Sequence, residues 1–193
     1  MCPGTVMISG TKIKIRPKKL EDAPNDYQWQ TDPELSDLDA MTPLKMSYES
    51  YLHEYREQMR CPPPSRRSFA IEMLDGTHIG NCVYYNIDTA NREAEVGIMV
   101  GNRDYWNHGY GTEAMRTLVD FVFRRHNFGR LYLKTLEKNL RAQQSFRKCG
   151  FTPCGHMERD GYCFLLMELP RARWHGLSAQ ATRPRRLFRL PTL

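Results

Sequence analysis

Residues 93–126 place a strand, a loop with two glycines and a long helix in immediate succession. The apolar run EAEVGIMV at residues 93–100 predicts a strand, and the polar and apolar faces of residues 111–126 predict an amphipathic helix. Gly109 and Gly111, in YWNHGYGT, therefore stand at a helix N-terminus. Unpaired N–H groups and the helix dipole favour phosphate there, and glycine keeps those N–H groups accessible. The pattern predicts a phosphate or pyrophosphate site.

Two common nucleotide motifs fit this segment poorly. A dinucleotide-binding fold would carry G-x-G-x-x-G near its first strand, inside a βαβ unit. A P-loop would continue into Gly-Lys-Ser or Gly-Lys-Thr, and here Gly111 is followed by Thr-Glu-Ala. The site is therefore expected to serve another class of phosphate-bearing ligand.

Alternation, caps and turn residues predict the remaining elements. Asp75-Gly76 and Asp160-Gly161 separate apolar runs and predict two β-hairpins. Ser47 is expected to begin a helix, and Gly150 to end one with Phe151 as its apolar contact. The predicted fold is α+β, with a mixed, mainly antiparallel sheet of about seven strands flanked by about four helices. One domain is expected over residues 8–170.

Charge and cysteine usage bound the class of protein. The chain has 193 residues and a net charge of +6, and the six arginines of residues 171–193 account for that charge. We expect a flexible arginine-rich tail there, with an RNA or ribosomal contact as a less favoured role. The six cysteines contain no CxxC pair, so no metal site is predicted and reduced, mainly core thiols are expected. The N-terminus lacks the apolar core of a signal peptide, no membrane-spanning run is present, and a cytoplasmic protein is expected.

Two motifs together resemble a known family. Residues 106–111, WNHGYG, are similar to the pyrophosphate motif Arg/Gln-x-x-Gly-x-Gly/Ala, with Trp106 at the first position. The motif Asn-x-x-Ala-x-x-x-aromatic-x-Lys-x-Gly-Phe is matched by Asn139, Ala142, Phe146, Lys148, Gly150 and Phe151. In this order they resemble the core of the GNAT superfamily of acetyl-CoA-dependent N-acyltransferases. The nearest subgroup contains the ribosomal-protein alanine or serine N-acetyltransferases and the spermidine acetyltransferases.

The resemblance implies where acetyl-CoA, the cosubstrate, would bind. The sheet would splay between its fourth and fifth strands, residues 93–100 and 130–137, and pantetheine would pair with the exposed edge. The loop amides would hold the pyrophosphate, and Asn139 would bind a pantetheine amide. Asn139 is an equally good N-cap, and Phe146 is equally suited to the core. The predicted cofactor-binding residues are Ile98, Met99, Val100, Trp106, Asn107, His108, Gly109, Tyr110, Gly111, Thr112, Asn139 and Phe146.

Acetyl transfer to an amine needs a base and a proton for the leaving thiolate. Glu95, a carboxylate inside an apolar strand, is the predicted base or water-orienting residue, with a structural ion pair as the alternative. Many family members place a tyrosine general acid where this chain has Phe146. A positioned acid contributes about 10²–10⁴-fold, but a thiol pKa of about 8.5 partly relieves the need for one. The lack of that tyrosine leaves open a non-catalytic acyl-CoA-binding or regulatory module.

The acceptor is expected to be a cationic amine. Residues 20–40 hold seven acids and no lysine or arginine, and the resemblance places this segment on the acceptor side. The amine of a protein N-terminus has a pKa of about 7.7–8.0, against about 10.4 for lysine, so it is easier to deprotonate. We therefore favour the N-terminus of a basic protein, with a polyamine second. The enzyme is expected to be a monomer or homodimer without membrane contact.

Overall fold

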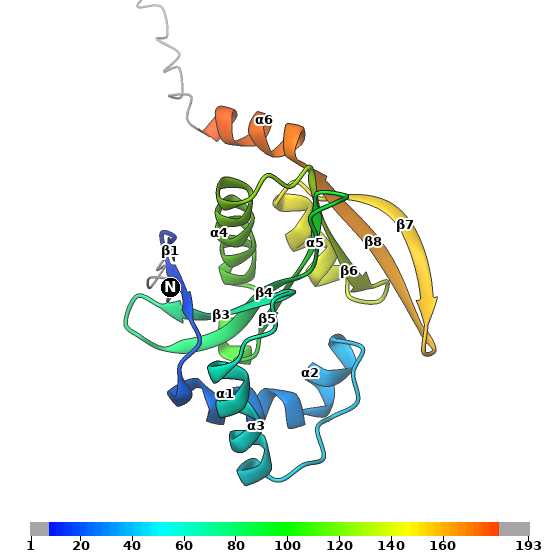
Figure 1. Cartoon of the computed structure of the whole chain (residues 1–193). Helices are drawn as coiled ribbons and strands as arrows, with labels where there is room; N and C mark the ends of the chain where they lie inside the picture. Colours follow the sequence, from blue (N-terminus) through cyan, green and yellow to red (C-terminus); the bar gives the residue numbers. More distant parts are fainter. Residues whose placement is uncertain (1–7, 182–193) are drawn as a thin grey trace, which may run out of the picture.

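The structure is a computed structural model that describes residues 8–181, with side chains described as far as residue 178 (Figure 1). An eight-stranded sheet runs in the order β1-β2-β3-β4-β5-β6-β8-β7 and is antiparallel except between β5 and β6. The strands are β1 (Ile8–Ser9), β2 (Ile13–Pro17), β3 (Arg66–Met73), β4 (His78–Asp88), β5 (Glu93–Val100), β6 (Arg130–Leu136), β7 (Thr152–Arg159) and β8 (Tyr162–Pro170). The helices are α1 (Ala23–Thr31), α2 (Pro33–Leu38), α3 (Tyr48–Arg60), α4 (Tyr110–Arg125), α5 (Leu140–Lys148) and α6 (Arg171–Ala181).

The local signals of the sequence produce the predicted elements. Asp160 and Gly161 join β7 to β8 with positive φ values of 52° and 78°, as a tight hairpin turn requires. The Ser47 side chain caps α3 by accepting from the Ser50 N–H. At the end of α5, Gly150 has φ 98° and the Phe151 N–H bonds to the Phe146 carbonyl, which closes the helix as expected. The predicted α+β fold is confirmed.

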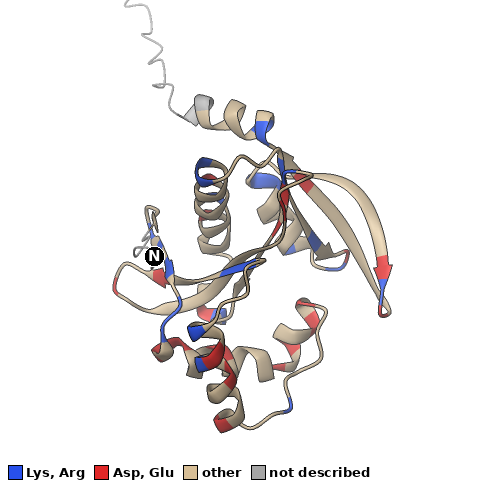
Figure 2. Ribbon diagram, in the orientation of Figure 1, with Lys and Arg blue, Asp and Glu red and all other residues tan. Residues whose placement is uncertain are grey.

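The main core lies between the sheet and the helices α4 and α5. Met115, Leu118 and Val122 of α4 are buried against sheet residues such as Ile71 and Leu131. Figure 1 shows α4 on one side of β3–β5 and the group α1–α3 on the other. Figure 2 shows that Asp and Glu residues are concentrated on α1–α3. The acidic segment therefore covers a different side of the sheet from the helix that begins at the glycines.

The sheet splays open between β5 and β6, as predicted. These parallel strands pair only at residues 93–95 with 130–132, although β5 continues to Val100 and β6 to Leu136. Beyond Glu95 the edge of β5 no longer has a partner strand on that side. The opening faces the N-termini of α4 and α5, because each of these helices follows one of the two diverging strands.

The C-terminal segment corrects one prediction. Residues 171–181 form α6, and Trp174 is buried, stacked on Phe123 with ring centroids 5.1 Å apart. The Arg171 guanidinium donates to the carbonyl oxygens of Phe123, His126 and Phe128. The predicted domain end at residue 170 and flexible tail are therefore wrong for residues 171–178, and residues 182–193 lie outside the described part. The sequence did not indicate this packing, because the segment is rich in arginine and its apolar face consists of little more than Trp174 and Leu177.

The cysteines are less buried than expected. Cys82 and Cys149 are core residues, but Cys61, Cys154 and Cys163 are exposed, and Cys2 lies outside the described residues. All five described thiols are free. Within residues 8–181, no helix is long and apolar enough to cross a membrane, and no cluster of His, Cys, Asp or Glu is arranged to hold a metal.

Candidate active site

A cleft of about 270 Å³ lies where β5 and β6 diverge. The end of β5, the loop before α4, the start of α5 and the end of α2 form its walls. Every residue predicted to bind the cofactor lines this cleft except His108, which is exposed and accepts a hydrogen bond from Lys12 at its carbonyl. The splay thus brings together residues that are far apart in the sequence.

The loop before α4 presents a row of unused backbone donors. Gly109 is the N-cap of α4 with φ 84°, and Asn107 also has a positive φ of 63°. Within the described structure, none of the backbone N–H groups of residues 107–112 donates a hydrogen bond to another residue. A Cβ added at Gly111 would lie 3.5 Å from Val100 and narrow the cleft. Converging N–H groups at a helix N-terminus fit a diphosphate.

Trp106 connects this loop to two other walls of the cleft. Its indole Nε1–H donates to the Val100 carbonyl oxygen at 2.6 Å, which ties the loop to the end of β5. The guanidinium of Arg141, from α5, lies over the indole ring at 3.5 Å from its centroid. The residue at the first motif position is therefore a structural junction with an arginine stacked on it.

Asn139 and its neighbours form the α5 wall. The Asn139 side-chain oxygen accepts from the Ala142 N–H at 3.1 Å, so its N-cap role is confirmed. Its amide NH₂ makes no hydrogen bond to any other described residue and remains available to a ligand. The Ser145 and Thr112 hydroxyl groups lie 2.8 Å apart and join α5 to α4. Phe146 is 6% exposed, so it belongs to the core and also forms part of the cleft wall.

Glu95 lies at the closed end of the splay and does not line the cleft. Its carboxylate is 1% exposed and accepts from the Tyr85 hydroxyl at 2.6 Å and the Asn86 side-chain amide at 2.9 Å. The Lys134 ammonium is 3.2 Å away. The structural ion pair, which was the alternative role for Glu95, is therefore present in the structure. Burial raises the pKa of Tyr85, and its hydrogen bond to Glu95 and the charges of Glu95 and Asp39 raise it further.

Asp39, at the end of α2, lines the cleft and was not singled out from the sequence. It is exposed, and in the described structure its carboxylate has no hydrogen-bond or ion-pair partner. Desolvation by the surrounding protein raises its pKa, while the charge of Arg66 partly offsets that effect. Its sequence position among six other acids offers no signal of this location.

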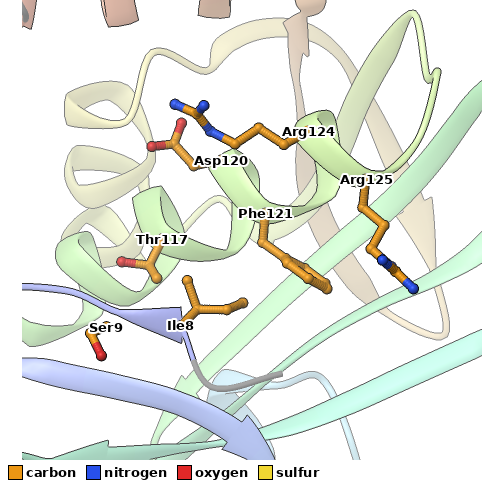
Figure 3. A pocket seen from close by; sticks show the side chains of 7 residues that line it. All are labelled: Ile8, Ser9, Thr117, Asp120, Phe121, Arg124 and Arg125. Atoms are coloured by element: carbon orange, nitrogen blue, oxygen red, sulfur yellow. The ribbon is translucent and has the colours of Figure 1, made fainter. Parts of the chain in front are cut away.

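A second hollow, of about 450 Å³, is larger but has different chemistry (Figure 3). It lies between β1 and α4 and is lined by Ile8, Ser9, Thr117, Asp120, Phe121, Arg124 and Arg125. Its α4 residues come from the middle and end of that helix, away from the N-terminal amides. We assign the functional site to the cleft because only the cleft contains those unused donors.

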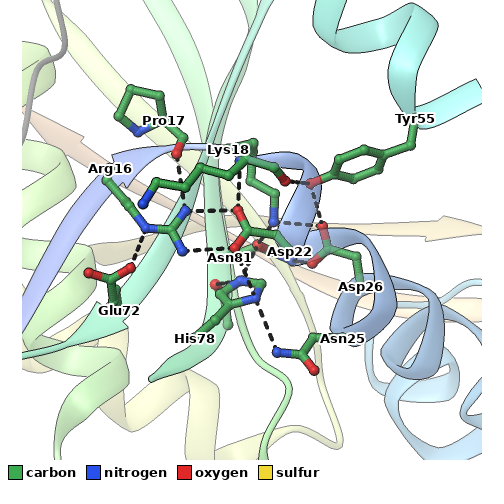
Figure 4. A network of polar contacts seen from close by, with 12 residues as sticks. Arg16, Pro17, Lys18, Asp22, Asn25, Asp26, Tyr55, Glu72, His78 and Asn81 are labelled. Atoms are coloured by element: carbon green, nitrogen blue, oxygen red, sulfur yellow. Dashed lines mark hydrogen bonds and ion pairs between the residues drawn. The ribbon is translucent and has the colours of Figure 1, made fainter. Parts of the chain in front are cut away.

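The acids of residues 20–40 do not act as one anionic wall, contrary to expectation. Asp22 and Asp26 are buried and pair with Arg16 and Lys18 at 2.8 and 2.6 Å (Figure 4). Outside that network, Asp32 and Glu34 pair with Arg103, and Asp37 pairs with Lys138. Basic residues from other parts of the chain therefore neutralise five of the seven acids. Only Asp39 among these seven lines the cleft.

Comparisons with known proteins show the family of this chain. The chain matches the acetyltransferase (GNAT) domain family over residues 12–152. It is 28% identical over 129 residues to an uncharacterised N-acetyltransferase, p20, of Bacillus licheniformis, covering 66% of this chain and 72% of that protein.

Solved structures show the same fold. Spermidine N-acetyltransferase of Vibrio cholerae, solved with CoA and spermine, has a TM-score of 0.76 at 17% identity, covering 86% of this chain and 99% of that one. An aminoglycoside acetyltransferase solved with coenzyme A has a TM-score of 0.71 at 17% identity, with the same coverage. The family match spans most of the described residues and includes both motifs of the cleft. The chain therefore belongs to the GNAT family of N-acetyltransferases, which transfer an acetyl group from acetyl-CoA to an amine.

Proposed function

We propose that this chain acetylates the N-terminal amine of a protein, with a polyamine as the second choice of acceptor. The observation that carries the proposal is the position of Asp39, the one unpaired acid of α1–α2 that lines the cleft. A single carboxylate suits a single ammonium group. A polyamine would gain more from several free carboxylates, and the neighbouring acids are already paired.

The walls formed by β5, the loop before α4 and α5 would bind acetyl-CoA with its diphosphate at the loop and its pantetheine arm along β5. The N–H groups of residues 107–112 would hold the diphosphate, and the free amide of Asn139 would bind pantetheine. The Val100 carbonyl is already bonded to Trp106, and Met99 turns its backbone carbonyl towards β4, so the backbone of Ile98 is left for pantetheine amides on this edge. A chain laid along β5 from the diphosphate leads towards Glu95, where the strands meet.

The acceptor would enter beside α2. Asp39 would bind the ammonium form and orient it, while Leu35 and Leu38 supply apolar contact next to it. The solved relatives named above act on polyamines or aminoglycosides, so the fold accommodates acceptors of several sizes.

Glu95 would remove the proton indirectly. Because its carboxylate is enclosed, the proton would pass through the Tyr85 hydroxyl, which donates to Glu95 and could accept from the amine or a bound water. The neutral amine would then attack the thioester carbonyl, and the thiolate would leave. Phe146 cannot donate a proton to that thiolate, so a water molecule would carry to it the proton that the acylated nitrogen loses as the amide forms, which a thiol pKa of about 8.5 permits.

The test is an acceptor panel with acetyl-CoA, following free thiol release and locating the acetyl group by mass spectrometry. The panel contains peptides with a free N-terminus and basic, neutral or acidic sequences, N-terminally blocked lysine peptides, and spermidine. We expect the N-terminal peptides to be acetylated fastest, with acetyl on the α-amine. Acetylation of spermidine or of lysine side chains in preference to every free N-terminus would contradict the proposal.

Asp39→Asn tests whether the Asp39 carboxylate binds the amine. It should raise the KM for the amine about tenfold, the effect of losing one hydrogen bond to a charged group. Glu21→Gln is the matched control, because Glu21 is also exposed and unpaired in the described structure but lies outside the cleft. Equal KM values for wild type, D39N and E21Q would remove Asp39 from the acceptor site.

A further inference from the structure

We propose that Arg141, held in place by stacking on Trp106, binds the diphosphate of acetyl-CoA and supplies the positive charge that the first motif position lacks in this chain. Trp106 is then a positioning residue for Arg141. This inference rests on the use of acetyl-CoA by the family and is independent of the acceptor proposed above.

The geometry of the pair restricts where the guanidinium can reach. The Arg141 Cζ atom lies 3.5 Å from the centroid of the Trp106 ring, a stacking distance. Trp106 is itself fixed by its hydrogen bond to the Val100 carbonyl. A guanidinium stacked by its face keeps its N–H groups in the plane, pointing away from the ring. The stack therefore presents a pre-oriented fork of donors within the cleft.

The donors of Arg141 are not used by the protein. Among the described residues, Arg141 has no hydrogen-bond or ion-pair partner, although it lines the cleft. Arg103, which also approaches the Trp106 ring at 5.7 Å, is held by Asp32 and Glu34. Of the two arginines at this tryptophan, one is neutralised and the other is left with its charge available.

The surroundings of Arg141 favour an anionic ligand. Desolvation lowers its pKa, and the charge of Glu34 opposes this shift. Arg141 is exposed and remains charged under all ordinary conditions, and no carboxylate of the described residues pairs with it, so an anionic ligand would complete its hydrogen bonds. The anion expected nearest Trp106 is a diphosphate, because the unused amides begin at the next residue, Asn107.

The two sets of donors come from different helices. The amides of residues 107–112 belong to the loop and first turn of α4, and Arg141 belongs to the first turn of α5. A planar guanidinium matches the spacing of phosphate oxygens and can donate two parallel hydrogen bonds. Arg141 and the loop would thus hold the diphosphate from two walls of one cleft. In this arrangement the charge comes from α5 instead of from the loop itself.

The experiment measures binding by titration calorimetry without any acceptor, using CoA, dephospho-CoA and pantetheine as probes. Arg141→Met should weaken binding of both CoA and dephospho-CoA by about 10- to 100-fold, the range for a hydrogen bond to a charged group. Binding of pantetheine should not change. Arg147→Met is the control, since Arg147 is an exposed arginine of the same helix that does not line the cleft.

Variants of Trp106 separate positioning from charge. Trp106→Leu removes the stack and should lower CoA affinity, but should add little to the loss caused by R141M in the double variant. Trp106→Phe keeps an aromatic ring for Arg141 to stack on and is the milder substitution for folding. It should lose less CoA affinity than W106L. Thermal midpoints without ligand confirm that each variant is folded.

Three results would overturn the inference. A loss of CoA affinity in R141M that is absent with dephospho-CoA would mean that Arg141 binds the 3′-phosphate. An equal loss with pantetheine would mean that the substitution distorts the cleft. Unchanged affinity for all three probes would mean that Arg141 does not touch the cofactor. Failure of any acceptor assay would leave these binding results intact, because no acceptor is present.

Discussion

Glu95 and Tyr132 form the last backbone pair between β5 and β6, and the two strands separate directly beyond them. The carboxylate of Glu95 therefore lies at the apex of the opening, enclosed by Tyr85, Asn86 and Lys134. The cleft occupies the wide end of the same opening. One irregularity of the sheet thus fixes the distance and direction from the proposed diphosphate site to the proposed base.

Glu95→Gln should lower turnover more at pH 7 than at pH 9 with an N-terminal amine as acceptor. The expected loss at pH 7 is about 100-fold, within the range for one positioned base. At pH 9 an amine with a pKa of about 7.7–8.0 is mostly neutral and needs no base. Tyr85→Phe should show the same trend, because its hydroxyl links Glu95 to the cleft in this mechanism.

Glu93→Gln is the matched control for that experiment. Glu93 precedes Glu95 on the same strand but pairs with Arg130 at 2.6 Å, at the start of β5. It should not change the shape of the pH–rate profile. A uniform loss at every pH in E95Q would show that Glu95 orients groups without taking a proton.

Gly109→Ala should weaken CoA binding because Gly109 has φ 84°, where a Cβ is strained and would disturb the loop amides. Gly111→Val should also weaken it, since its side chain would project between Val100 and the loop. Calorimetry with CoA measures both effects. The expected loss for each is at least tenfold, equivalent to about 1.4 kcal/mol.

Gly161→Ala separates backbone strain from ligand contact. Gly161 also has a positive φ, 78°, but lies in the β7–β8 hairpin away from the cleft. Gly161→Ala should lower the free energy of unfolding by about 1–2 kcal/mol, as expected for a side chain at a positive φ. It should leave CoA affinity unchanged. Equal CoA affinity in wild type, G109A and G111V would argue against a diphosphate at this loop.

Much of the fold could be predicted because local and tertiary preferences agree. The Asp-Gly turns, the cap at Ser47 and the glycine at the end of α5 each specify backbone geometry within a few residues. Gly109 and Gly111 likewise mark the N-terminus of α4 by their position alone. These signals need no knowledge of distant contacts, so the sequence predicts them well.

The parts that could not be predicted depend on long-range contacts. The stack of Arg141 on Trp106 joins α5 to a loop of another motif, and the pairing of Asp37 with Lys138 joins residues far apart in the chain. A list of acids along residues 20–40 carries no information about such partners. The location of Asp39 at the cleft has the same origin.

Trp174→Ala should destabilise the fold by about 3–5 kcal/mol, the usual range for a large buried aromatic side chain. Trp174 is 7% exposed, stacks on Phe123 and donates to Asp120. Truncation after Pro170 should destabilise at least as much, because it also removes the Arg171 contacts. Urea unfolding measures both.

Arg173→Ala is the control on the same helix, because Arg173 is exposed. It should change stability by less than about 0.5 kcal/mol, as expected for a surface substitution. If truncation after Pro170 left the unfolding midpoint unchanged, α6 would be an appendage and its packing would contribute nothing.

Stability should fall as the pH drops from 7.5 to 5, and His78 should cause part of the fall. His78, the first residue of β4, belongs to the buried network of Figure 4 and contacts Asn25 of α1. Burial lowers its pKa, the charge of Lys18 lowers it further, and Asp22 and Asp26 act in the opposite direction. A histidine with a lowered pKa in the folded state binds fewer protons than in the unfolded chain, whose pKa is about 6.5. Its contribution is therefore fully present above that pH and declines below it.

Thermal midpoints across this pH range test the prediction. His78→Gln should show a smaller drop between pH 7.5 and 5 than wild type. Burial and the charges of Arg125 and Arg67 also lower the pKa of His126. His126→Gln should therefore remove a further part of the drop in thermal midpoint. His53→Gln, at an exposed position of α3, is the control and should retain the full drop. Carboxylates contribute little to the change, because unfolded Asp and Glu have pKa values of about 3.9 and 4.3. A wild-type midpoint that does not fall on acidification, or an equal fall in H78Q and wild type, would show that the network tolerates a protonated His78.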